Sequence, residues 1–161
     1  MTSEPADSMQ PFAEIAQGFC AWCEGTSLGH EPEMTASSWL AKLHAAALTL
    51  PSVEPENSDG LPDLPATEVR KAEGNLACFN GRYYREYFNP DPELNEEAVM
   101  GDVGDDLLDT YKDIKAGCVL LARGQSTEAL WYWAFLHRIH WGHHAVGALF
   151  ALHCLSISRR E

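Results

Sequence analysis

Apolar residues recur three and four positions apart over most of the chain, which is the spacing of one face of an α-helix. This pattern predicts five helices, over residues 9–25, 37–50, 67–79, 103–123 and 126–157. No long stretch alternates apolar and polar residues, so no sheet is predicted. The last segment is apolar nearly all the way round, as a helix surrounded by neighbours is, and it is therefore expected to be the central element.

Prolines and glycines mark where these helices end. Pro51 cannot continue the second helix, Gly81 follows the third in an Asn-Gly pair, and Gly124 follows the fourth. Residues 51–65 hold four prolines and a glycine, a composition that disfavours both helix and strand. This segment is predicted to be a loop.

The resulting fold class is all-α, an irregular bundle of about five helices around a nearly all-apolar C-terminal helix. Residues 1–8 are polar and are expected to form a disordered N-terminus. Residues 9–157 are expected to form a single helical domain that includes the proline-rich loop 51–65. A chain of 161 residues with 45% hydrophobic residues is long enough for one such core.

The net charge of −13 argues against sequence-independent binding to nucleic acid or to an anionic membrane, because both need a Lys/Arg surface. A protein partner or a metal cation is electrostatically easier, and the sequence leaves the oligomeric state open. The N-terminus lacks the features of a signal peptide, so a cytoplasmic location is expected. The apolar run 129–157 contains Arg138 and five histidines, which makes a membrane span unfavourable. The five cysteines are an odd number and are expected to form no structural disulfides.

Histidines in the predicted last helix are the clearest candidates for chemistry. His137, His140 and His144 lie at i, i+3 and i+7 and would span an arc of about 60° on one helix. Imidazoles one turn apart can share a divalent transition metal such as Zn, Fe, Ni or Cu. They can equally be core side chains whose nitrogens bind carboxylates, carbonyls or water. The second interpretation is preferred, because spacing alone does not specify a metal site.

The predicted fourth helix carries a matching stripe of carboxylates at Asp106, Asp109 and Asp113. These residues are further metal-ligand candidates. On a helical wheel, however, the stripe is centred about 125° from the apolar seam through Leu107. We therefore expect most of it to be a solvated helix face, with only Asp106 near the boundary.

Two other sequence features indicate a function less clearly. Cys20 and Cys23 form a CxxC, but no second such pair completes a zinc site, and helical core spacing explains them better. Residues 86–113 carry ten acidic side chains and one lysine. The resulting negative field favours solubility, or the binding of a cation or a basic partner.

The segments YYREYFNPDP, DDLLDTYKD and EALWYWAFLHRIHWGHHAVGALFALH together resemble the bacterial family called domain of unknown function 5063. The resemblance covers roughly residues 76–155. It implies a small, helical, bacterial cytoplasmic protein and brings no reaction, ligand or partner. It also marks Asp106, Asp109, Asp113, His140 and His144 as family motif positions.

These observations leave two main hypotheses. The preferred one is a non-catalytic, protein-binding or scaffold domain with a buried His/Asp polar network. The alternative is a metal-dependent hydrolase, in which His137, His140 and His144 with Asp106 or Asp109 hold an ion between the last two helices. A third hypothesis is a small-molecule site lined by the tyrosines and by Trp131, Trp133 and Trp141.

Overall fold

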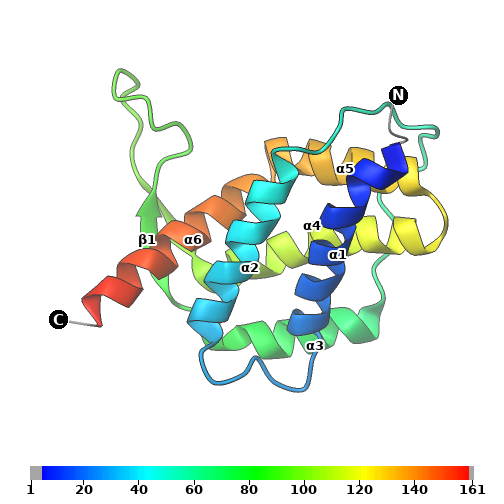
Figure 1. The fold of residues 1–161 in the computed structure, drawn as a ribbon. Helices are drawn as coiled ribbons and strands as arrows, with labels where there is room; N and C mark the ends of the chain where they lie inside the picture. The colour runs from blue at the N-terminus through cyan, green and yellow to red at the C-terminus, as the bar shows by residue number, and fades with distance from the viewer. Residues whose placement is uncertain (1–4, 160–161) are drawn as a thin grey trace.

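The computed structural model describes residues 5–159, which form a predominantly helical fold with one small sheet (Figure 1). This confirms the predicted fold class. The elements in chain order are α1 (Pro5–Cys23), α2 (Pro32–Ala47), α3 (Ala66–Leu76), the short 3-10 helix η1 (Ala77–Phe79), β1 (Tyr83–Glu86), β2 (Val99–Asp102), α4 (Val103–Ala122), α5 (Ser126–Ile139) and α6 (Trp141–Ser158).

Helix starts differ most from the sequence-based expectation where a proline begins the helix. α2 starts at Pro32, five residues before Ser37, because proline at the first helical position has its backbone angle already set. α1 starts at Pro5, within the segment 1–8 that was expected to be disordered, and residues 1–4 lie outside the described residues. α3 and α4 start within one residue of the predicted positions.

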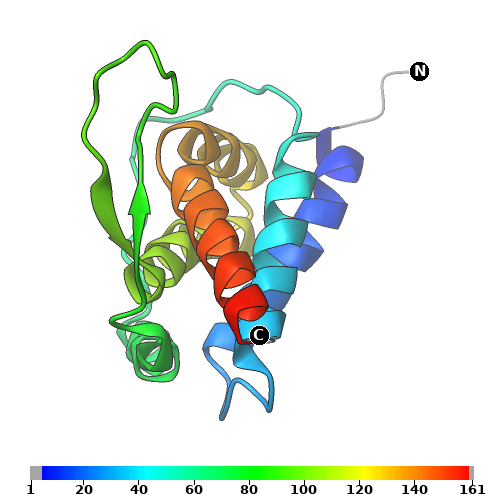
Figure 2. The ribbon, with the colours of Figure 1, turned by 90° about the vertical axis from the view of Figure 1, so that its left-hand side faces the viewer.

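Helix α4 packs against α1, α3, α5 and α6, so it has neighbours on several sides. Its buried residues include Leu107, Tyr111 and Ile114, all fully inaccessible to solvent. α6 also packs against α2, and Figure 2 shows α6 with α2 on one side and the β-hairpin on the other. This arrangement places one face of α4 against the first turns of α6.

Two predictions about local structure are wrong. The segment 126–157 is not one helix, because the backbone at His140 (φ −145°, ψ −85°) leaves the helical region and separates α5 from α6. A sheet is also present: β1 and β2 pair antiparallel, with Tyr84 opposite Gly101. The four-residue strands are too short to show an alternating pattern.

The hairpin is tied to the start of α4. Asp102 is the N-cap of α4, and its Oδ1 accepts a hydrogen bond of 2.8 Å from the backbone N–H of Gly104. Its Oδ2 accepts a second bond of 2.8 Å from the N–H of Gly81, just before β1. None of the helices within residues 5–159 combines the length and the apolar character needed to cross a bilayer.

The proline-rich loop 51–65 is anchored by a buried carboxylate. Glu128 on α5 is 3% exposed, and its Oε1 accepts hydrogen bonds from the backbone N–H of Glu56 (2.7 Å) and of Asn57 (3.0 Å). Thr127 adds a bond of 3.0 Å to the Glu56 side chain. These bonds satisfy backbone N–H groups of the loop that have no hydrogen-bond partner within the loop itself.

Replacing Glu128 by alanine is expected to lower the free energy of unfolding by about 1–3 kcal/mol, because two hydrogen bonds from the loop backbone to its charged carboxylate are lost. Chemical denaturation followed by circular dichroism measures this loss. The exposed Glu54, in the same loop, provides a control in E54A, which should unfold at the wild-type denaturant concentration. Equal stability of the Glu128→Ala variant and the wild type would contradict the anchoring role.

Candidate metal centre

The carboxylates Asp106, Asp109 and Asp113 of α4 face the start of α6. Their side chains are 5%, 39% and 13% exposed, respectively. The expectation of a mainly solvated stripe is therefore wrong for Asp113, whereas Asp106, which was expected near the boundary, is buried. The reason is that α4 is covered on more than one side, so a face far from its main apolar seam is also buried. Carboxylates in such positions need partners.

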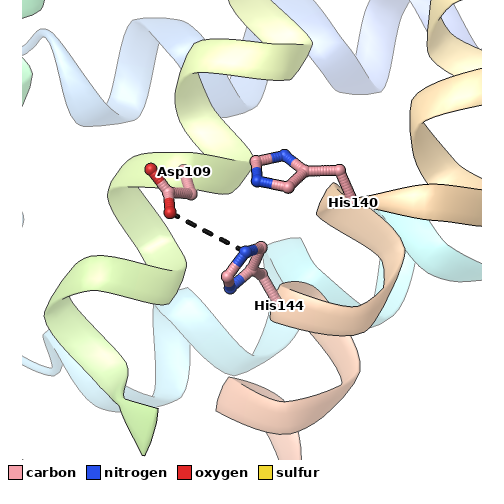
Figure 3. Close-up of side chains that lie close together, drawn as sticks. All are labelled: Asp109, His140 and His144. Carbon is pink, nitrogen blue, oxygen red and sulfur yellow. Dashed lines mark ion pairs between the residues drawn. The ribbon is translucent and has the colours of Figure 1, made fainter. Parts of the chain in front are cut away.

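Histidines from the first turn of α6 provide these partners. His140 stands at the break before α6, and its backbone N–H still donates to the carbonyl of Leu136 at 2.8 Å. His144 follows one helical turn later, so both imidazoles project from the same side of α6 toward α4 (Figure 3). The two ring centroids are 4.8 Å apart.

Each of the two imidazoles is held at Nδ1 by its own carboxylate. His144 Nδ1 lies 2.7 Å from Asp106 Oδ1, and His140 Nδ1 lies 2.6 Å from Asp113 Oδ2. The bond to Asp106 raises the pKa of His144, whereas burial raises the pKa of Asp113. With Nδ1 occupied, the Nε2 atom of each ring remains for another ligand.

Asp109 completes a group of three. Its Oδ2 is 3.7 Å from His144 Nε2, and one donor atom from each of Asp109, His140 and His144 lies within 4.8 Å of the others (Figure 3). Donors around a tetrahedral zinc ion are about 3.3 Å apart, given bond lengths of about 2.0–2.2 Å. Small side-chain rotations would therefore bring these three atoms to coordination distance.

Two residues of β1 lie next to this group, and sequence reasoning did not single them out. Tyr84 on β1 donates a hydrogen bond of 2.6 Å to Asp106 Oδ2. Glu86, on the same face of β1, places Oε2 3.0 Å from His143 Nε2, although their orientation is not that of a hydrogen bond. The spacing of Tyr84 and Glu86, two apart as on one face of a strand, was the available signal.

His137 does not join the other two histidines. Its Nε2 lies 3.0 Å from Nδ1 of His44 on α2. Burial and the neighbouring His44 lower the pKa of His137. The single stripe predicted for three histidines is wrong because the break at His140 gives α6 a new axis.

The other candidates lie elsewhere. Trp133 and Trp141 are fully buried in the core, so they line no accessible aromatic site. Trp131 does line a cavity of about 480 Å³, together with Phe135 and the start of the proline-rich loop. Cys20 and Cys23 are buried core side chains, and burial raises the pKa of both thiols.

The fold is similar to that of a solved structure. The crystal structure of protein BF1032 from Bacteroides fragilis matches with a TM-score of 0.73 and 21% sequence identity, over 92% of this chain and 91% of that chain. At this identity the likeness shows a shared fold alone. No curated protein matches the chain. The model of the family described as Domain of unknown function (DUF5063) matches residues 3–158, so the chain belongs to this family, as its sequence motifs indicated.

Proposed function

We propose that the protein is a metal-dependent hydrolase that binds one divalent transition-metal ion at Asp109, His140 and His144. The observation that carries this proposal is the arrangement of nitrogens. Asp113 and Asp106 occupy the Nδ1 atoms of His140 and His144. The Nε2 atom of His144 lies 3.7 Å from the Asp109 carboxylate, and one donor atom from each of Asp109, His140 and His144 lies within 4.8 Å of the others.

A carboxylate at Nδ1 has a defined chemical effect. It favours the tautomer that carries the proton on Nδ1, so the lone pair is on Nε2, where a metal binds. Metal-ligating histidines are commonly oriented by such a carboxylate. A polar network that served stability alone would need the pairs His144–Asp106 and His140–Asp113, but it would not need Asp109 beside them.

Three protein ligands suit catalysis better than a closed structural site. Catalytic zinc sites use three protein ligands and keep a position for water, whose pKa falls to about 7. The site is accessible, since the side chains of His140 and Asp109 are 43% and 39% exposed. His143, with its ring centroid 6.2 Å from that of His144, is the nearby side chain proposed to accept a proton during hydrolysis.

A second candidate function is the non-catalytic binding of a basic protein partner. It is favoured by the loop between β1 and β2, which stands away from the helices (Figure 1) and exposes Tyr87, Phe88 and Leu94 among acidic residues. Such a function would require no metal ion. The metal content of the protein therefore separates the two candidates.

The purified full-length chain, produced in medium containing Zn²⁺, Mn²⁺ and Co²⁺, is expected to hold about one ion per chain by elemental analysis. The loaded protein is then assayed against a panel of esters, amides and phosphodiesters. Activity should disappear with a chelator and return with the added ion. The proposal would be contradicted if the purified protein held no more metal than the buffer and if titration with Co²⁺ produced no absorption band.

A further inference from the structure

Tyr84 reaches the site through a space kept open by two glycines. Gly101 is its cross-strand partner on β2, and a Cβ atom there would lie 2.6 Å from the Tyr84 ring. Gly147 on α6 faces the other end of the side chain, where a Cβ atom would lie 2.4 Å from the phenolic oxygen. Carbon atoms do not approach so closely, so a side chain at Gly101 or Gly147 would displace Tyr84.

The phenol at the end of this path fixes a carboxylate. It donates at 2.6 Å to Oδ2 of Asp106, while the other oxygen, Oδ1, binds His144 Nδ1 at 2.7 Å. Asp106 is thus held at both oxygens, and its residue is 3% exposed. A carboxylate with a fixed partner at each oxygen has one orientation. It therefore also fixes the orientation of the imidazole that is bound to it.

We infer that Tyr84 is a positioning residue of the metal centre and that the β-hairpin, which carries Tyr84, belongs to this centre. This inference rests on the proposed function. The phenol orients Asp106, and Asp106 orients His144, so that Nε2 of His144 is directed toward Asp109. The hairpin therefore contributes to metal affinity without providing a ligand.

The first test compares Tyr84→Phe with Tyr83→Phe, its neighbour on the exposed face of β1. Titration with Co²⁺, followed by absorption, is expected to show about tenfold weaker binding for Tyr84→Phe, the lower end of the effect of losing an outer partner of a metal ligand. The Tyr83→Phe variant should bind as the wild type does. Equal affinities for the two variants would overturn the inference.

A second variant removes the phenol from its place without changing the tyrosine. Gly147→Ala is expected to weaken Co²⁺ binding as Tyr84→Phe does, because the new methyl group takes the position of the hydroxyl. Since both changes act through the same hydrogen bond, the double variant should bind no more weakly than either single one. Additive losses would show that Gly147 acts by another route and would overturn this part of the inference.

A metal-free measurement separates this inference from the proposed function. In the apo protein at constant pH, ¹⁵N-edited NMR follows the Nδ1–H proton of His144, which the bond to Asp106 protects from exchange. Faster exchange in Tyr84→Phe, but not in Tyr83→Phe, supports the positioning role even if the wild type binds no ion. Identical exchange in all three proteins overturns it, whatever the metal content.

Discussion

Replacing Asp109 by alanine is expected to weaken Co²⁺ or Zn²⁺ binding by more than about 100-fold, which exceeds the usual 10–100-fold cost of losing an outer partner. The reason is that the carboxylate is a direct ligand in the proposed site. Among the described residues its polar contact is with His144 Nε2 at 3.7 Å, so its removal leaves no buried group without a partner. Isothermal titration calorimetry measures the change.

Asp105 provides the matched control, because it lies on α4 but is exposed. D105A should retain the wild-type affinity. Saturating metal should raise the melting temperature of the wild type and of D105A, and leave that of Asp109→Ala unchanged. A melting temperature that responds equally in all three proteins would place the ion somewhere else.

Truncating Trp133 to alanine is expected to cost about 3–5 kcal/mol of folding free energy, because a fully buried indole leaves a large cavity. Trp133 packs against Phe12, with ring centroids 5.0 Å apart. Its Nε1 also donates a hydrogen bond of 3.0 Å to the carbonyl of Ile114, which fastens α5 to α4. Urea denaturation followed by far-ultraviolet circular dichroism gives the loss.

Trp131, two residues earlier on the same helix, is the control for this variant. It is only partly buried and stacks on Phe135 at 4.7 Å. The Trp131→Ala variant should lose about 1 kcal/mol, the value of an aromatic pair beyond its buried area. Comparable losses in both variants would mean that α5 is not fastened through Trp133.

The sequence predicts α4 almost to the residue, because its apolar seam and Gly124 mark its extent, and the structure adds the Asp102 cap at its start. It does not predict the break at His140, because apolar residues continue through Ile139 and Trp141 without a proline. The glycine at 142 was the one local sign of a turn.

The sequence predicts the candidate site only in part, because residue type and spacing do not show which helix faces meet. The histidines and aspartates were identified by residue type and spacing, and the structure brings Asp109, His140 and His144 together. A helical wheel assigns one buried face to each helix and so placed Asp113 in solvent, whereas α4 has neighbours on several sides and Asp113 is largely buried. The role of Tyr84 depends on the pairing of β1 with β2, which four-residue strands do not reveal in sequence.

The position of His140 at the joint between two helices makes this part of the chain intolerant of changes in length. If one residue were inserted between Ile139 and Trp141 and α6 kept its place, every residue of α6 would move one position along the helix and turn by about 100° about its axis. His144 would then turn away from α4, and Asp106 would lose its partner. Among variants selected for function, insertions and deletions should therefore collect in the loop between β1 and β2 and be absent from this joint.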